Sequence, residues 1–269
     1  MKEEKAIATI EGWEDGKPYI RDTSKLDRWE LQSAERLTIH IGDEDVVLVQ
    51  DPHSNHLGGY IWLTSIVFCK YLYALSHKRD RHNFIQLDRN KRWVELGSGV
   101  GLIGIMLHKL GLENVTITDI AELLPTMERN VEANNYAVHT ITGRRENTAK
   151  QDNQSIIVEP LLWNDAEAIS HIKSMGDIDY IVACDCIYSE ASAIDLVETM
   201  DHLATSQTYI ICISEVRNQA AQDAFLAEAK KRFTVDLIPA IQWQKKVTDI
   251  SFDETLNLYR LRKPKRATK

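Results

Sequence analysis

The pattern of apolar and polar residues changes near residue 90. Beyond it, short apolar runs alternate with stretches in which apolar residues recur every three or four positions. The short runs predict strands, and the recurring pattern predicts amphipathic helices. Because alternation of the two is typical of βα units on a mainly parallel sheet, the pattern predicts an α/β fold.

Seven strands are expected in this region. They cover residues 92–96, 115–118, 155–162, 180–183, 208–213, 233–239 and 255–261. Helices are expected at residues 102–110, 121–134, 191–203 and 219–232. No helix is expected between the last two strands, so we predict that they form an antiparallel hairpin at one edge of the sheet.

The first ninety residues have a different pattern. Apolar and polar residues alternate at 37–41, Gly42-Asp43-Glu44-Asp45 supplies a turn, and the apolar run 46–49 returns, which predicts a β-hairpin. A helix is expected at 60–75, and the polar stretches 78–90 and 143–154 are expected to be loops. We therefore predict an N-terminal extension (1–90) packed on a core (91–262), followed by a short basic tail (263–269).

Composition narrows the class of protein. Of the 269 residues, 43% are hydrophobic and 27% are charged, which suits one large core or two small ones. The formal net charge of −8 argues against a broadly basic surface for nucleic acid or membrane. The four cysteines are too few for a disulfide scaffold, and Cys184 and Cys186 are interpreted as small buried residues rather than metal ligands. We expect a cytoplasmic or nuclear protein without a metal.

A glycine-rich segment is the most informative part of the chain. Residues 94–101 read Val-Glu-Leu-Gly-Ser-Gly-Val-Gly and join a predicted strand to a predicted helix. Glycine at such a junction lets the backbone approach a ligand, because a Cβ would collide with it. Gly97, Ser98 and Gly99 are therefore candidate ligand-binding residues.

Two acidic residues narrow the choice of ligand. Asp119 ends the next predicted strand, where a carboxylate can accept hydrogen bonds from both hydroxyls of an adenosine ribose. This position suits NAD and S-adenosylmethionine equally. Glu95, two residues before Gly97, suits a cationic ligand better than a pyrophosphate, so it favours the sulfonium cofactor S-adenosylmethionine.

Four segments resemble those of class I (seven-β-strand) methyltransferases, and most closely methyltransferase family 16. They are Gly-x-x-Trp at 59–62, the glycine motif at 94–104, Leu-x-Trp at 161–163 and Asp-x-x-Tyr at 185–188. The resemblance runs from about residue 58 to residue 262. Members of this family methylate lysines of non-histone proteins such as chaperones and translation factors.

The resemblance implies a Rossmann-like sheet of seven strands, S-adenosylmethionine as cofactor and a lysine-bearing protein, of the chaperone or elongation-factor type, as substrate. A small side chain at Ala183 leaves room for a nucleoside, and Trp163 is expected to stack near the adenine. The full set of expected cofactor-binding residues is Trp62, Glu95, Gly97, Ser98, Gly99, Asp119, Ile120, Trp163 and Ala183.

Asp185 and Tyr188 are the candidate catalytic residues. Asp185 follows a predicted strand, and ligands of parallel sheets bind beyond the carboxyl ends of strands. A lysine amine has a pKa of about 10.4 and must lose a proton before it can accept a methyl group. We expect Asp185 to orient the lysine nitrogen and Tyr188 to shape its channel. Glu190 and Glu215 are interpreted as solvated surface residues.

Three alternatives stay open. The same cofactor can serve a methyltransferase of a small amine. Gly99-x-Gly101-x-x-Gly104 also permits an NAD(P)-dependent oxidoreductase. The chain can also be a catalytically idle binding module. We expect a monomer, because no exposed apolar stripe is evident.

Overall fold

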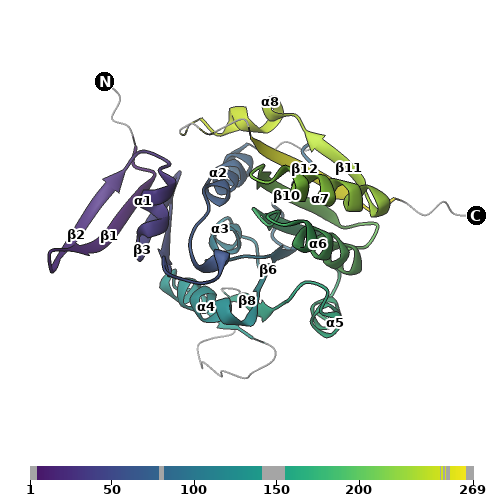
Figure 1. The fold of residues 1–269 in the computed structure, drawn as a ribbon, viewed down its shortest axis with the longest axis horizontal. Coiled ribbons are helices and arrows are strands. Elements are labelled where there is room, and N and C mark those ends of the chain that lie inside the picture. Colours follow the sequence, from purple (N-terminus) through teal and green to yellow (C-terminus); the bar gives the residue numbers. More distant parts are fainter. Residues whose placement is uncertain are drawn as a thin grey trace, which may run out of the picture.

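The computed structural model describes residues 5–78, 82–140, 155–248, 250, 252 and 255–264. Their larger sheet has eight strands in the order β11-β12-β10-β9-β5-β6-β8-β7 (Figure 1). The strands are β5 (Arg92–Leu96), β6 (Asn114–Asp119), β7 (Ala137–His139), β8 (Ser155–Pro160), β9 (Tyr180–Cys184), β10 (Tyr209–Glu215), β11 (Thr234–Ile238) and β12 (Leu256–Arg262).

This sheet confirms the predicted α/β fold. Neighbouring strands from β7 to β10 pair in parallel, and β12 pairs antiparallel with both β10 and β11. The seven predicted strands are all present, and β7 is an additional short strand at one edge. β12 enters between β10 and β11, so the predicted terminal hairpin has its second strand inside the sheet.

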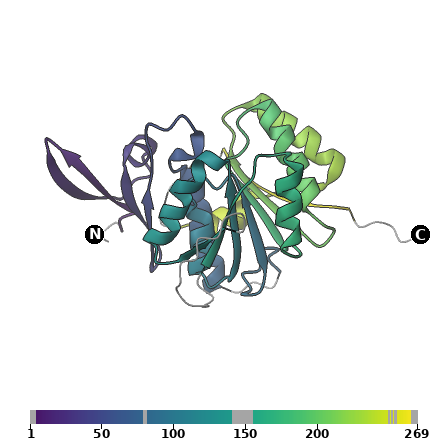
Figure 2. The same ribbon diagram turned by 90° about the horizontal axis from the view of Figure 1, so that it is seen from below.

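Helices cover both faces of the larger sheet (Figure 2). Successive strand residues point to opposite faces, so Trp93 packs in one apolar core and Val94 in the other. The first core contains α2 (Leu63–His77), α3 (Leu102–Lys109) and α4 (Leu124–Ala133). The second contains α5 (Ala166–Ser174), α6 (Glu190–Leu203) and α7 (Gln219–Arg232).

The N-terminal residues form a second sheet of four antiparallel strands in the order β2-β1-β3-β4. The predicted hairpin is β3 (Arg36–Ile41) and β4 (Glu44–Val49). The sequence analysis missed β1 (Ala8–Glu14), β2 (Lys17–Thr23) and the short helix α1 (Arg28–Ser33). Apolar residues of this sheet, such as Ile39 and Leu48, belong to the same core as α2, α3 and α4.

Smaller differences from the prediction have local causes. Helix α2 begins at Leu63 rather than at residue 60, because Trp62 has an extended backbone. Not predicted from the sequence were α5, α8 (Ala240–Trp243) and the 3-10 turns η1 (Leu57–Gly59) and η3 (Gln244–Lys246). The helix expected at 121–134 begins with the 3-10 turn η2 (Ala121–Leu123) and continues as α4. The described residues of the 78–90 stretch contain no helix or strand, as expected for a loop. The predicted loop at 143–154 lies outside the described residues.

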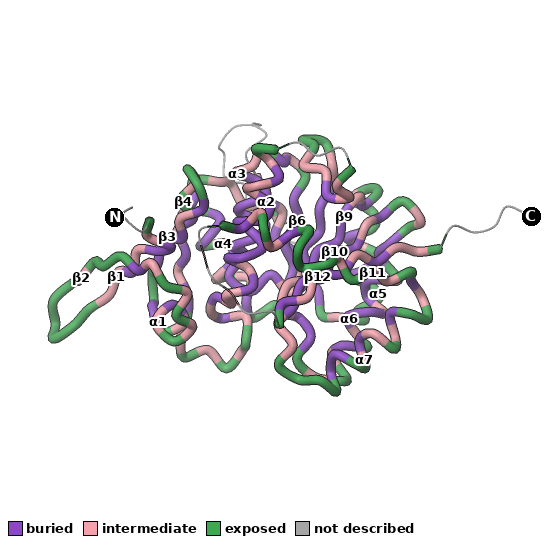
Figure 3. Tube along the Cα trace, turned by 90° about the horizontal axis from the view of Figure 1, so that it is seen from above, coloured by how far each residue is buried: buried purple, intermediate pink, exposed green. Residues whose placement is uncertain are grey.

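The hairpin of β1 and β2 projects from the rest of the molecule and is largely exposed (Figure 3). Trp13, Ile20 and Trp29 of the N-terminal region are exposed large apolar side chains. The expectation of a monomer, which was based on the lack of an evident exposed apolar stripe in the sequence, stays a prediction. Within the part of the chain that the structure describes, no helix combines the length and apolar character needed to cross a membrane.

Two asparagines, Asn130 in α4 and Asn134 immediately after its last residue, connect the N-terminal sheet to the core. The Asn130 side chain accepts a hydrogen bond from Val49 N (2.7 Å) and donates to Val49 O (3.0 Å) and Val100 O (2.9 Å). One turn later, the Asn134 side chain accepts from Val47 N (3.1 Å) and donates to Val47 O (2.7 Å). These amides satisfy the outer edge of β4 as a neighbouring strand would.

Asn130→Ala should lower the free energy of unfolding by about 2–4 kcal/mol, because it leaves buried backbone groups of Val49 and Val100 without partners. Urea denaturation measures this loss. Glu132→Ala is the matched control, since Glu132 is an exposed residue of the same helix. A loss no larger than that of the control would contradict this role for Asn130.

Candidate functional site

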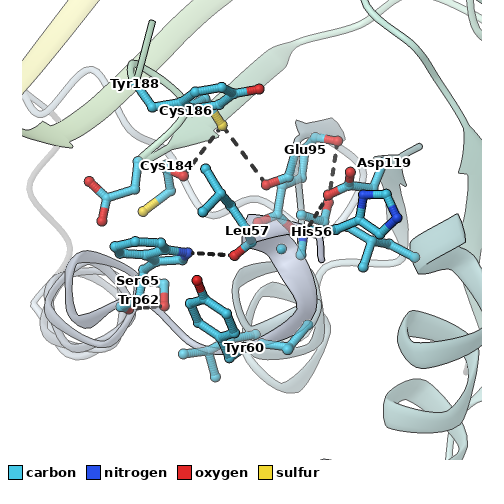
Figure 4. A pocket seen from close by; sticks show the side chains of 18 of the residues that line it. His56, Leu57, Tyr60, Trp62, Ser65, Glu95, Asp119, Cys184, Cys186 and Tyr188 are labelled. Carbon is cyan, nitrogen blue, oxygen red and sulfur yellow. Dashed lines mark hydrogen bonds between the residues drawn. The ribbon is translucent and has the colours of Figure 1, made fainter. Parts of the chain in front are cut away.

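A cavity of about 260 Å³ lies beyond the carboxyl ends of β5, β6, β9 and β10. Its volume is near the lower end of the range for small-molecule pockets, about 300–1,000 Å³. Figure 4 shows Tyr60 and Trp62 of the N-terminal region facing Cys186 and Tyr188 of the core across this cavity. The lining therefore combines strand ends of the larger sheet with the segment that connects β4 to α2.

The glycine turn forms the floor of the cavity. Gly97, Gly99 and Gly101 have φ values of 65°, 54° and 82°, in the left-handed region that favours glycine. A Cβ on Gly97 would lie 2.8 Å from Cys186 Sγ, and one on Gly99 would lie 3.0 Å from Gly58 O. Because glycine has no Cβ, these two positions let Cys186 and the backbone of Gly58 approach the turn closely.

Asp119 is held rigidly at the end of β6. Its Oδ2 accepts a hydrogen bond from Gly99 N and its Oδ1 accepts one from Ile120 N, both at 2.8 Å. Burial raises the pKa of Asp119, and these two hydrogen bonds oppose that effect. The carboxylate lines the cavity with further lone pairs available, so it can accept hydrogen bonds from a ligand.

Glu95 is almost fully buried, with 2% of its surface exposed. Its Oε2 accepts a hydrogen bond from Gly104 N in α3 at 3.0 Å. Burial raises the pKa of Glu95 to about 8, and the hydrogen bonds from Ser98 and Gly104 oppose that increase. The described contacts of Glu95 include no ion pair. A cation bound in the cavity would therefore stabilise the ionised form of this carboxylate.

Asp185 follows β9 with a backbone φ of 57°, which is uncommon for a residue with a side chain. Hydrogen bonds to β10 hold it there: Asp185 N donates to Ile213 O, and Glu215 N donates to Asp185 Oδ1, both at 2.9 Å. Asp185 Oδ2 lies 2.6 Å from Arg217 Nη2. Burial raises the pKa of Asp185, and Arg217 opposes that increase.

Aromatic residues form two walls of the cavity. Trp62 Nε1 donates to Leu57 O at 2.8 Å, which fixes the indole against η1 (Figure 4). The rings of Trp163 and Tyr188 lie 6.2 Å apart, centre to centre. Tyr188 is 45% exposed, so its phenol lies at the rim. The site thus has buried carboxylates inside and aromatic rings around the entrance.

Ten of the predicted site residues line this cavity: Trp62, Glu95, Gly97, Ser98, Gly99, Asp119, Ile120, Trp163, Asp185 and Tyr188. Ala183 does not. Side chains alternate along β9, so Cys184 faces the cavity while Ala183 is buried in the second core, which contains α6. The prediction that Ala183 makes room for a nucleoside is not supported by this geometry.

The sequence analysis missed Arg217 and misinterpreted Glu215. Glu215 is not a solvated surface residue: its Oε2 lies 2.5 Å from Arg28 Nη2 and 2.8 Å from Arg217 Nε. Glu215 ends β10 and Arg217 follows it, and Asp185 follows the neighbouring strand β9. The rule that carboxyl ends of adjacent parallel strands meet at one edge could have identified them.

The predicted burial of the cysteine pair is correct for Cys186, whereas Cys184 is partly exposed. Both line the cavity, and burial raises the pKa of both thiols. Cys186 Sγ donates a weak hydrogen bond to Leu96 O at 3.3 Å. Among the described residues, no group of three or more His, Cys, Asp and Glu side chains is arranged to hold a metal ion.

The lining fits S-adenosylmethionine. Asp119 offers acceptors for ribose hydroxyls, Trp163 offers an aromatic face for an adenine, and Glu95 offers a carboxylate to a cation. The glycine turn leaves space that a Cβ would otherwise fill. Asp185 and Tyr188 lie apart from these groups in the chain but line the same cavity, so a second reactant can meet the first there.

Glu95 should make stability depend on pH. The unfolded chain loses this proton near pH 4.5 and the folded chain near pH 8, so the folded state binds more protons between these values. The free energy of unfolding therefore falls as pH rises through this window. Glu95→Gln should remove that fall, because glutamine has no proton to lose. The free energy of unfolding near pH 8 should then rise by roughly a few kcal/mol. Thermal melts at pH 5 and pH 8, with exposed Glu132→Gln as control, test this; parallel profiles would contradict it.

Solved structures of methyltransferases have a fold similar to that of this chain. A Streptococcus mutans protein described as a candidate S-adenosylmethionine-dependent methyltransferase superposes with a TM-score of 0.52 and 12% identity, over 91% of this chain and 58% of that one. A second candidate methyltransferase, solved with S-adenosylhomocysteine, gives a TM-score of 0.51 and 12% identity, over 85% of this chain and 56% of that one. These similarities confirm the Rossmann-like methyltransferase fold.

Sequence relatives are more specific. Methyltransferase-like protein 23 of Dictyostelium discoideum is 30% identical over 58% of this chain and 59% of its own length. Protein N-lysine methyltransferase METTL21A of Xenopus tropicalis is 28% identical over 72% of this chain and 76% of its own length. The chain thus spans little more than half the length of the first of these.

Residues 41–232 match the family described as lysine methyltransferase, which is methyltransferase family 16. This chain therefore belongs to the lysine methyltransferase family, a family of S-adenosylmethionine-dependent methyltransferases.

Proposed function

We propose that this protein transfers a methyl group from S-adenosylmethionine to the side-chain amine of a lysine in a non-histone protein, of the chaperone or translation-factor type. The observation that carries the proposal is one cavity that contains Glu95, Asp119 and Asp185 from the carboxyl ends of three strands. Family membership, and relatives named as protein N-lysine methyltransferases, support lysine as the acceptor.

One end of the cavity would hold the cofactor. Asp119 and Ile120 would bind its ribose side, the glycine turn would lie beneath it, and Glu95 would face its positive charge. Bound S-adenosylmethionine supplies an electrophilic methyl group on a sulfonium sulfur. The walls made by Trp62 and Trp163 would exclude water and hold the methyl group in one direction.

The other end would receive the lysine. An ionised Asp185 attracts the ammonium, and its burial makes this carboxylate a better proton acceptor than an exposed aspartate. Tyr188 lies at the rim, where its phenol can contact the lysine stem or amine. Alignment of the neutral amine with the methyl group would supply much of the rate enhancement, since proximity and orientation contribute roughly 7–11 kcal/mol.

Other parts of the proposal concern the cell. The four cysteines are free, which supports a reducing compartment, and we propose the cytoplasm or the nucleus. A protein partner without nucleic acid or membrane is proposed from the net charge of −8. The monomeric state stays a prediction.

Asp119→Ala should weaken binding of S-adenosylhomocysteine about 10- to 100-fold, because a charged hydrogen-bond acceptor is lost from a buried site. Isothermal titration calorimetry with S-adenosylmethionine, S-adenosylhomocysteine and NADH measures this. The control is Glu122→Gln, an exposed acidic residue that does not line the cavity. Binding of NADH alone, or of none of the three compounds, would overturn the cofactor assignment.

Asp185→Asn should lower methyl transfer by at least about 100-fold and leave the dissociation constant of S-adenosylhomocysteine within about threefold, because it removes a proton acceptor from the acceptor end only. The assay is incorporation of labelled methyl groups into proteins of a cell lysate, followed by identification of the modified lysine. Asp223→Asn, on the exposed part of α7, is the matched control. Normal transfer by Asp185→Asn would remove Asp185 from catalysis.

A further inference from the structure

Arg217 occupies surroundings that suit a lysine ammonium. Its guanidinium carbon lies 4.2 Å from the centre of the Trp62 ring. Its Nη2 lies 2.6 Å from Asp185 Oδ2, and its Nε donates to Glu215 Oε2 at 2.8 Å. An aromatic face together with two carboxylates binds organic cations of either kind, guanidinium or ammonium.

We propose that Trp62, Asp185 and Glu215 form the binding cage of the acceptor lysine, and that Arg217 is its tethered occupant, which the substrate must displace. The inference rests on the proposed function, because a lysine is needed to compete for the cage. It adds to that function a residue outside the sequence motifs, and it makes lysine binding an exchange of one cation for another.

The charges of the cluster support an exchange. Asp185 and Glu215 contribute two negative charges, and Arg217 and Arg28 contribute two positive charges. Removing the Arg217 guanidinium leaves one net negative charge, which one ammonium neutralises. Only 2% of the Asp185 side chain is exposed, so an unpaired carboxylate there would be costly. The ionised cage is therefore more stable when one cation occupies it.

The position of Arg217 permits this exchange. Arg217 lies in the short connection between β10 and α7, outside both elements, and 27% of its side chain is exposed. Rotation of this side chain toward solvent requires no change in a helix or strand. Glu215 meanwhile remains paired with Arg28 of α1, so one wall of the cage keeps its charge partner after Arg217 leaves.

The tether also explains how the cage can distinguish substrates. A free amine must compete with a guanidinium whose effective local concentration is high, because Arg217 is attached beside the cage. A lysine presented by a docked protein has a comparable advantage, whereas a small amine in solution has none. The arrangement thus favours an acceptor that is part of a bound protein.

The test measures the cage directly with n-butylammonium chloride, which mimics the end of a lysine side chain. Calorimetric titrations use the full-length chain at constant ionic strength, balanced with sodium chloride. Arg217→Ala should bind n-butylammonium at least about tenfold more tightly than the unaltered protein. Arg217→Lys, which keeps a tethered cation, should resemble the unaltered protein, and 1-butanol should show no gain with any variant.

Arg28→Ala is the matched control for charge, because it removes one positive charge from the same cluster and leaves Arg217 in place. The Arg28 guanidinium carbon lies 5.9 Å from the centre of the Trp62 ring, against 4.2 Å for Arg217, and the described ion pair with Asp185 belongs to Arg217. The double variant Arg217→Ala/Asp185→Asn should lose the gained affinity. Equal affinity of Arg217→Ala and the unaltered protein, or an equal gain in Arg28→Ala, would overturn the proposal.

Folding and cofactor binding are measured separately. If Arg217→Ala shows no cooperative thermal transition, Arg217→Gln replaces it, since glutamine retains a polar partner for the carboxylates. Titration with S-adenosylhomocysteine reports the other end of the cavity. If the unaltered protein does not bind S-adenosylhomocysteine, the proposed function is wrong. If it binds this compound but Arg217→Ala shows no gain in affinity for n-butylammonium, only the cage proposal is wrong.

Discussion

The close approach of backbone segments at the glycine turn is the constraint on which the rest of the structure depends. A Cβ on Gly104 would lie 2.0 Å from Ile117 Cγ2, so α3 can pack on β6 only without a side chain there. Ser98 N donates to Thr118 O, and Thr118 N donates to Ser98 Oγ, which join the turn to the same strand. Because Gly58 packs against Gly99 as well, the covering segment from the N-terminal region reaches the floor of the cavity.

The site is built from acidic groups in an environment that favours their neutral forms. Burial raises the pKa values of Glu95, Asp119 and Asp185, and all three line one cavity. Buried acids are an unfavourable feature of a core, and they are found together where a ligand compensates them. Asp185 forms an ion pair with Arg217, whose side chain is also accessible to solvent. A positively charged cofactor and a positively charged acceptor are therefore suited to the same cavity.

The sequence predicted the parallel sheet well, because buried strands such as β9 and β10 are short apolar runs between amphipathic helices. It also predicted much of the cavity lining, since Glu95 lies near the carboxyl end of such a run, Asp119 ends one and Asp185 follows one. The β1–β2 hairpin was missed although Asp15-Gly16 is a strong turn signal; both residues have positive φ values, as a tight hairpin turn requires. Arg217 was missed for another reason: the carboxyl end of β10 was not considered together with that of β9. Its contact with Trp62, which is distant in sequence, appears only in the folded chain.

Asn130 and the C-terminal capping residue of α4, Asn134, influence where the segment that covers the cavity begins. Asn130 and Asn134 are four residues apart on a helix, a rise of about 6 Å, and Val47 and Val49 are two residues apart on a strand, a rise of about 6.6 Å. The two repeats nearly coincide, so a helix can pair with a strand through side-chain amides. A slip of β4 by one residue would turn its free backbone groups away from α4 and break both contacts. Helix α4 thus fixes the register of β4, and with it the point from which the chain sets out over the cavity toward Trp62.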